Sequence, residues 1–225
     1  MTVCSGKQSH ILALDTVGGN IAACIISDGR QHILPPDKHN SGITRSTAIT
    51  PALHGLLEQA GLNWTQLDVL ALGAGPGSFT GLRIAAATLA GINAGLHLPI
   101  VHLSSLAITA RQADSQEAIR VLEDARAGEL FYGSYQQGNA MEADCCLRWR
   151  QLETCQPGLF CSVHEPPVSL EGWTRTALSI SRSQALALEA KAACERVMDW
   201  SCVPAYPSPN YLQLSQAERN SHAAA

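Results

Sequence analysis

Two apolar runs joined by a pair of glycines open the chain. Residues 11–17 read I-L-A-L-D-T-V and become polar at Asp15, while residues 20–27 form a second run after Gly18-Gly19. Apolar runs of strand length on both sides of a two-residue glycine turn are typical of an antiparallel hairpin. A shorter strand is expected at residues 31–34, so the pattern predicts three meandering strands.

The hydrophobic period changes to that of a helix after Thr44. Apolar residues recur at three- and four-residue spacing up to Gly61, which favours a helix with a glycine at its C-terminal end. Pro51 must lie in the first turn of this helix or kink it, because an interior proline removes a backbone hydrogen bond. The periodic apolar residues are Ile49, Leu53, Leu56, Leu57 and Ala60.

A second strand and helix follow. Residues 67–72 are expected to form a short buried strand, and residues 82–96 a helix that is apolar almost all round and rich in alanine and glycine. Such a helix is expected to be buried on more than one side. A further strand at 99–103 and a helix from a Ser104-Ser105 cap to about Arg111 complete the first half of the chain.

The chain then repeats its opening pattern. When Asp124 is aligned on Asp15, the apolar residues 130–135 fall on residues 21–26, so that strand, aspartate, turn and antiparallel strand occur twice. We therefore predict an α/β protein of two related lobes, divided at the polar stretch 112–117. The predicted lobes are residues 1–112 and 113–225.

The second lobe has a weaker pattern. It predicts a strand within residues 141–150, a loop over 158–168 and an amphipathic helix over 181–198. The tail from Gln213 onward is expected to be frayed.

Composition and charge restrict the class of protein. The 225 residues include 15 Lys and Arg against 19 Asp and Glu, and 46% are hydrophobic, so a disordered chain is excluded. A stand-alone nucleic-acid binder would carry a basic face, which this mildly acidic balance does not favour. No apolar run reaches the roughly 18 residues of a membrane span. Residues 1–10 do not resemble a leader, and the eight cysteines form no C-x-x-C pair, so we expect a cytoplasmic protein with reduced thiols.

The loop at residues 73–81, G-A-G-P-G-S-F-T-G, is a candidate anion site. Glycines let backbone amides approach a phosphate, and the next helix offers its N-terminus. The loop has neither the G-K-[ST] of a P-loop nor the spacing G-x-G-x-x-G. The alternative is that the glycines form a tight strand-to-helix turn, with Ser78 or Thr80 as the helix cap.

Three charged residues, Asp15, Asp124 and Arg83, could have either a binding role or a structural role. Asp15 and Asp124 follow apolar strands, where a carboxylate can hold a magnesium-bound water or accept turn amides. Arg83 is the only charged residue between Asp68 and Arg111 and could close on a phosphate or on an internal carboxylate. No H-x-x-x-H pair and no G-x-S-x-G nucleophile motif is present, so we predict neither a metal site nor a catalytic residue.

Residues 75–84, G-P-G-S-F-T-G-L-R-I, resemble the glycine motif of the TsaB family, also called YeaZ. These are accessory subunits of bacterial tRNA threonylcarbamoyladenosine synthesis. I-L-A-L-D-T at residues 11–16 and D-A-R-x-G-E at residues 124–129 add to the resemblance, which covers roughly the first 135 residues. Near the C-terminus, residues 209–212 are similar to the family's P-x-Y-L-R, with Gln213 in place of the arginine.

The resemblance implies a two-lobed actin-like fold of the Hsp70 and hexokinase type. It further implies a non-catalytic subunit that dimerises through N-lobe helices with a TsaD-like subunit, which transfers a threonylcarbamoyl group to adenosine 37 of tRNAs reading codons that begin with A. A TsaE-like ATPase joins the dimer, and tRNA is contacted only through the complex. ATP and Mg²⁺ are used by the partner subunits, and no cofactor is expected to bind tightly to this chain. The weak nucleotide-binding candidates are Asp15, Thr16, Gly75, Gly77, Thr80 and Arg83.

The helices at residues 44–60 and 82–96 are the predicted partner surface. Small residues at three- and four-residue spacing let another helix approach closely. The alternative is that helix 82–96 packs only inside its own lobe, and a homodimer through the same face is possible without the partner. The predicted interface residues are Ile49, Leu53, Leu56, Ala86, Ala87, Ala90, Gly91 and Ala94.

Two other functions stay open at this point. A small-molecule kinase or ATPase of the actin-like superfamily would need phosphate-binding turns in both lobes, and residues 113–225 contain no G-[TS]-G-rich loop. A metallopeptidase would need a histidine pair or an H-E-x-x-H helix, which the sequence lacks.

Overall fold

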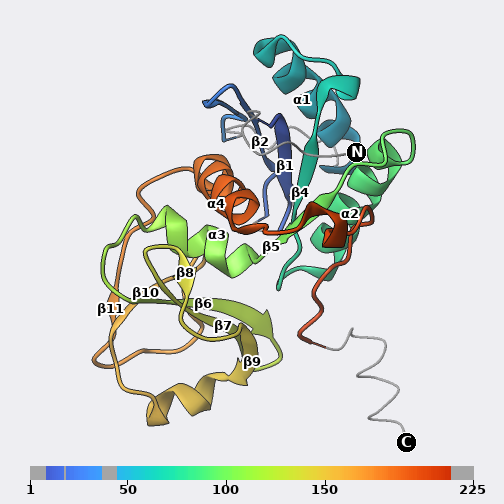
Figure 1. The fold of residues 1–225 in the computed structure, drawn as a ribbon. Helices are drawn as coiled ribbons and strands as arrows, with labels where there is room; N and C mark the ends of the chain where they lie inside the picture. Colours follow the sequence, from blue (N-terminus) through green and yellow to red (C-terminus); the bar gives the residue numbers. More distant parts are fainter. Residues whose placement is uncertain (1–8, 18, 37–44, 214–225) are drawn as a thin grey trace, which may run out of the picture.

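The computed structural model describes residues 9–17, 19–36 and 45–213. It contains two β-sheets in two lobes, with helices α3 and α4 side by side between them (Figure 1). The predicted α/β class and the two lobes are confirmed. The tail beyond Gln213 and the start of the first predicted helix at Thr44 lie outside the described residues.

The first sheet has the strand order β3-β2-β1-β4-β5. β1 and β2 form the predicted antiparallel hairpin, with Ile11 opposite Ile26, whereas β1, β4 and β5 run parallel. The parallel connections pass through α1 and α2. The elements are β1 (Ile11–Asp15), β2 (Ala22–Ser27), β3 (Arg30–Ile33), α1 (Arg45–Ala60), β4 (Val69–Gly73), α2 (Phe79–Asn93), β5 (Ile100–Leu103) and α3 (Ser105–Gln112).

Both faces of the first sheet are covered, which explains the nearly continuous apolar runs of its central strands. Leu12 and Leu14 face the core formed with α1 and α2. Ile11 and Ala13 point to the opposite face, where they join a core with α3 and a later helix, α4 (Arg182–Arg196). Pro51 lies in the interior of α1, beyond its first turn.

The second sheet repeats the hairpin of the first. β6 and β7 are antiparallel, as expected from the alignment of Asp124 on Asp15, and the path through the sheet is β11-β10-β6-β7-β8, with β9 paired to β7. β10 lies within the segment predicted as a loop. The elements are β6 (Ile119–Arg126), β7 (Glu129–Gln136), β8 (Asn139–Ala140), β9 (Cys145–Arg148), β10 (Leu159–Cys161) and β11 (Thr174–Arg175).

The predicted lobe boundary does not describe the last part of the chain. The helix predicted over 181–198 is α4, which has Ser181 as its N-cap and packs on the first sheet through Ala185 and Leu186. Beyond it, Ile100 donates a backbone hydrogen bond to Pro204 at 2.7 Å. The assignment of all residues from 113 to 225 to the second lobe is therefore wrong for residues 181–203, because α4 packs against β1, β2 and β5 and the residues after it up to Val203 join the same core.

Candidate functional site

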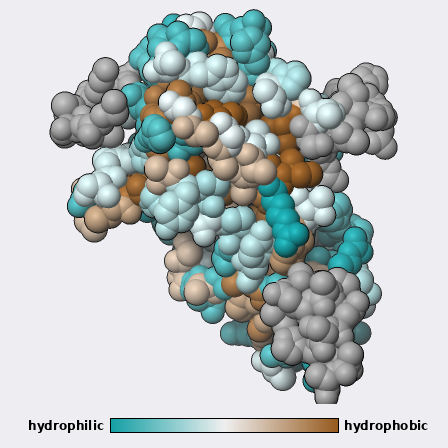
Figure 2. Space-filling view, turned by 90° about the vertical axis from the view of Figure 1, so that its right-hand side faces the viewer, coloured by the Kyte–Doolittle hydropathy of each residue, from teal (hydrophilic) through white to brown (hydrophobic). Residues whose placement is uncertain are grey.

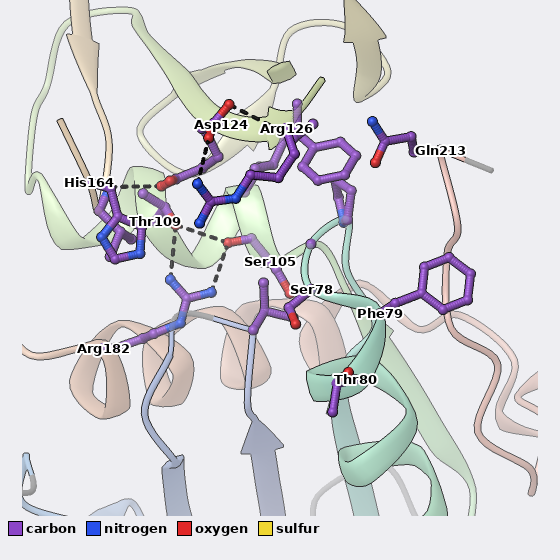
Figure 3. Close-up of a pocket in the computed structure, with 18 of the residues that line it drawn as sticks. Ser78, Phe79, Thr80, Ser105, Thr109, Asp124, Arg126, His164, Arg182 and Gln213 are labelled. Carbon is purple, nitrogen blue, oxygen red and sulfur yellow. Dashed lines mark hydrogen bonds and ion pairs between the residues drawn. The ribbon is translucent and has the colours of Figure 1, made fainter. Parts of the chain in front are cut away.

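A cleft of about 640 Å³ lies between the two lobes. Its lining on one side comes from the glycine loop, residues 76–80, and on the other from residues 123–126 of β6 and the loop at 163–164 (Figure 3). Arg182 of α4, together with Ser105 and Thr109 of α3, completes the lining. We call this space the interlobe cleft.

The glycines of the loop allow close packing against the end of β1. A Cβ atom on Gly77 would lie 2.0 Å from Val17 Cγ1, and one on Gly81 would lie 2.7 Å from the Thr16 carbonyl oxygen. Ser78 caps α2 by accepting the Gly81 amide at 3.4 Å. This loop was interpreted either as an anion site or as a tight strand-to-helix turn. These contacts favour the turn.

Two of the groups that could have bound a phosphate are engaged within the protein. The Gly75 amide donates to Ser105 Oγ at 3.1 Å. Thr16 is fully buried, and its hydroxyl donates to the Gly81 carbonyl oxygen at 2.6 Å. Thr80 is exposed at the start of α2.

Asp15 is the last residue of β1 and is completely buried. Its Oδ1 accepts the Val17 amide at 2.8 Å, and its Oδ2 accepts the Nε and Nη2 groups of Arg182 at 3.1 and 2.7 Å. The carboxylate therefore accepts a turn amide and, in addition, has an arginine counter-ion. Arg182 was not among the predicted site residues, because it is 167 positions away in the sequence and only the fold brings it to Asp15.

Asp124 was expected either to hold a magnesium-bound water or to accept amides of the turn. In the structure it accepts a turn amide. Its Oδ1 accepts the Arg126 amide at 3.1 Å, and its Oδ2 lies 3.3 Å from Arg126 Nη1. The neighbouring Glu123 also lines the cleft, and its Oε1 accepts the Val163 amide at 2.8 Å. Burial raises the pKa of the Glu123 carboxyl to about 7. Sequence reasoning missed Glu123, because nothing in an alternating strand marks one carboxylate as buried.

Arg83 forms no ion pair with a carboxylate among the described residues, and the phosphate alternative stays a prediction. Its guanidinium carbon lies 4.8 Å from the centre of the Phe79 ring, which stacks in turn on Tyr211. The segment that carries Tyr211, residues 204–213, returns along the first lobe and is called here the C-terminal strap. Asn210 of the strap donates its amide to the Ala74 carbonyl oxygen at 2.7 Å, and the Gln213 side chain hydrogen-bonds Glu129 of the second lobe.

The outer face of α2 is a second candidate site. Ala87, Ala90, Gly91 and Ala94 are exposed, and a groove of about 580 Å³ runs between α2 and Trp64. A Cβ atom on Gly91 or Gly95 would meet no atom within 4 Å. Figure 2 shows apolar residues gathered in the upper half of this side of the molecule, at the height of α1 and α2.

The other predicted interface residues are not available to a partner in this structure. Ile49, Leu53 and Leu56 are at most 1% exposed in the core beneath α1, and Ala86 is 9% exposed. Helix α2 is also buried on one side only, which corrects the expectation of burial on several sides. The interface prediction is therefore reduced to the exposed small residues of α2.

Two classes of site are not found in the described part of the chain. It contains no group of three or more His, Cys, Asp or Glu side chains that could hold a metal ion. Within the same residues, no helix is long and apolar enough to cross a membrane.

Comparison with known proteins agrees with the resemblance of the glycine motif. Residues 43–150 match the family model of TsaD, tRNA N6-adenosine threonylcarbamoyltransferase. The chain is 35% identical over 134 residues to the tRNA threonylcarbamoyladenosine biosynthesis protein TsaB of Escherichia coli, which is 57% of this chain and 55% of that protein. The TsaB protein of Haemophilus influenzae is 30% identical over 156 residues, or 65% of this chain and 64% of that protein. The structure of YeaZ from Pseudomonas aeruginosa superposes with a TM-score of 0.72 at 26% identity, covering 91% of this chain and all of that chain.

Over part of its length the chain is similar to TsaB proteins. Its sequence match spans little more than half of the length of the curated relatives. The superposition on YeaZ confirms the two-lobed fold that the family resemblance implied. In this chain, the glycine motif at 75–84 forms the turn beneath the interlobe cleft, and the motif at 124–129 forms the turn between β6 and β7.

Proposed function

We propose that this chain is a TsaB-family protein and a non-catalytic accessory subunit of the cytoplasmic complex that transfers a threonylcarbamoyl group to adenosine 37 of tRNAs reading codons that begin with A. It acts by dimerising with a TsaD-like catalytic subunit. A TsaE-like ATPase joins this dimer, and tRNA reaches the chain only through the complex. The names of the Escherichia coli and Haemophilus influenzae relatives support the pathway.

The exposed stripe of small residues on α2 carries this proposal. Ala87, Ala90, Gly91 and Ala94 leave the helix backbone open to close approach by another helix, as in tight helix packing. Such side chains lose little conformational entropy when a partner covers them. The groove beside Trp64 gives the partner a concave surface next to the stripe. In the absence of the partner, a second copy of the chain can use the same face.

The non-catalytic role is supported by the interlobe cleft. Its buried carboxylate, Asp15, is paired with Arg182, and the amide of Gly75 is bound to Ser105. Arg83 lies over Phe79. A kinase or ATPase of this fold would need such groups for nucleotide and Mg²⁺, so we expect ATP and Mg²⁺ to be used by the partner subunits and no cofactor to bind tightly to this chain.

The test is reconstitution of the transfer reaction with purified components. The TsaD-like and TsaE-like proteins of the same organism are combined with tRNA, ATP, Mg²⁺ and a threonylcarbamoyl donor, with and without this chain, and modified adenosine is quantified by mass spectrometry. We expect the product only when the chain and the TsaD-like subunit are both present, and none from the chain alone. Transfer by the chain alone, or equal transfer without it, would contradict the proposal.

A further inference from the structure

A third pocket, of about 600 Å³, lies in the second lobe. It is formed by the 3₁₀ helix η2 (Trp149–Thr154) and by the segments 155–157 and 168–173. Its lining residues differ from those of the interlobe cleft and of the groove beside α2. β9, which precedes η2, lies in the lower part of the molecule, whereas α2 lies in the upper half (Figure 1). We call this space the η2 pocket.

The indole of Trp149 brings an unpaired hydrogen-bond donor to the η2 pocket. Its side chain lines the pocket, and the residue is only 6% exposed. Its Nε1 group is buried, and no described residue accepts its hydrogen. An indole nitrogen can only donate, and buried donors in folded proteins nearly always have an acceptor, because burial removes the hydrogen bond to water. A carbonyl oxygen of a ligand in the pocket would supply this acceptor.

The walls of the η2 pocket are apolar and held in place. Trp173 is fixed from one side by Arg120, whose guanidinium carbon lies 5.3 Å from the centre of the indole ring. A Cβ atom on Gly172 would lie 3.3 Å from Pro157, so the two segments that form the pocket are closely packed. Val168, a further lining residue, is 41% exposed. The pocket therefore offers an apolar, aromatic surface that is already formed.

The charges of the η2 pocket favour a basic ligand over a nucleic acid. Its lining contains two glutamates, Glu153 and Glu171, and one arginine, Arg150. All three are exposed. A groove for single-stranded nucleic acid has an excess of basic side chains that neutralise the phosphates. The excess of carboxylates here complements a lysine or arginine instead.

We propose that the η2 pocket binds a proline-rich segment of a partner protein, with a basic residue next to the prolines. Such segments adopt the polyproline II conformation and dock on aromatic surfaces. Their carbonyl oxygens can accept the Trp149 Nε1 hydrogen, and proline has no N–H group that would itself need an acceptor in an apolar pocket. The basic residue lies against Glu153 and Glu171. This binding is independent of docking through α2, so either can fail without the other.

Nuclear magnetic resonance of the ¹⁵N-labelled full chain tests the proposal, with an oligoproline peptide that ends in arginine as the probe. The indole signals of the four tryptophans are assigned by single Trp→Phe substitutions. We expect the signal of Trp149 to move downfield and to saturate, because its N–H gains an acceptor. The signal of Trp173 should shift with it, and those of Trp64 and Trp200 should stay in place. Trp149→Phe keeps an aromatic ring without the donor and should weaken peptide binding about tenfold.

The charge of the pocket gives a second test, which does not depend on the folding of Trp149→Phe. The double variant Glu153→Gln/Glu171→Gln changes exposed side chains only and should bind the arginine peptide several-fold more weakly. Glu195→Gln is the matched control, because it removes an exposed carboxylate of α4 outside the pocket and should bind as the wild type does. An oligoproline peptide that ends in glutamate should bind the wild type more weakly than the arginine peptide.

Three results would overturn the proposal. The first is a Trp149 signal that stays in place throughout the titration with the arginine peptide. The second is equal binding of the arginine and glutamate peptides. The third is a Trp149 signal that moves with single-stranded RNA, or with the concentration of the chain itself, and not with the peptide.

Discussion

The ring of Tyr211 stacks on the ring of Phe79, with centroids 4.3 Å apart and planes 15° from parallel. Arg83 covers the Phe79 ring with its guanidinium, 4.8 Å from the ring centroid. The two stacked residues are far apart in the sequence, so their contact attaches the C-terminal strap to the glycine loop. Arg83, one of the residues that suggested a phosphate site, thus has an aromatic partner inside the chain.

Tyr211→Ala should loosen the strap without unfolding the lobes. A stacked aromatic pair contributes about 0.5–1.5 kcal/mol beyond burial, so we expect the free energy of unfolding in urea to fall by about 1 kcal/mol and amide exchange to increase over residues 208–213. Tyr206→Ala is the control, because its side chain is 67% exposed. Equal effects of the two substitutions would show that the stack does not hold the strap.

Gly77→Ala should destabilise the first lobe. The added Cβ would lie 2.0 Å from Val17 Cγ1, at a φ of +156°. Overpacking of this kind costs about 1–3 kcal/mol, and urea denaturation measures it. Gly91→Ala is the matched control: its Cβ meets open space on an exposed helix, and alanine is favoured there by about 0.5–1 kcal/mol. A Gly77→Ala variant as stable as Gly91→Ala would mean that the loop packs differently on β1.

Glu123 should make the stability of the chain fall with rising pH. Burial raises the pKa of its carboxyl from 4.5 to about 7, so the folded state binds more protons than the unfolded state between these values. Stability from this group is therefore present below pH 4.5 and is lost as the pH rises to about 7. Glu123→Gln keeps the acceptor for the Val163 amide and removes the charge.

The expected result is a difference that depends on pH. Wild type and Glu123→Gln should be equally stable near pH 4.5, and the variant should be more stable at pH 8, by up to about 3 kcal/mol at about 1.4 kcal/mol per pKa unit. Urea unfolding at a series of pH values measures this. Parallel stability curves for the two proteins would show that Glu123 titrates in its ordinary range.

Periodicity predicted most of the local structure, because each strand and helix carries its own apolar face. The hairpin at Asp15, its repeat at Asp124 and the helix that starts at Ser181 were all visible in this way. The short strand β10 was missed, because its three residues gain their place only by pairing with the neighbouring strands β6 and β11. The docking of α4 on the first sheet was also missed, since an amphipathic helix does not encode which sheet it covers.

The candidate site shows a similar division. The glycine motif marked a loop that lines the interlobe cleft, but Arg182 could not be found from the sequence, because an ion pair between distant positions leaves no local pattern. The periodic apolar residues Ile49, Leu53 and Leu56 predicted a buried face, and periodicity cannot distinguish burial in the core from burial by a partner. Their exposure of at most 1% shows that the core covers them.

The affinity of this chain for the TsaD-like subunit of its own organism tests the central claim most directly. Isothermal titration calorimetry is carried out with the wild type, with Ala90→Glu on the exposed face of α2, and with Leu188→Glu as the matched control. Leu188 is 40% exposed on α4, which covers the opposite face of the first sheet. We predict that the wild type and Leu188→Glu bind with equal affinity and that folded Ala90→Glu does not bind. Wild-type affinity of the folded Ala90→Glu variant would contradict the assignment of α2 as the docking surface.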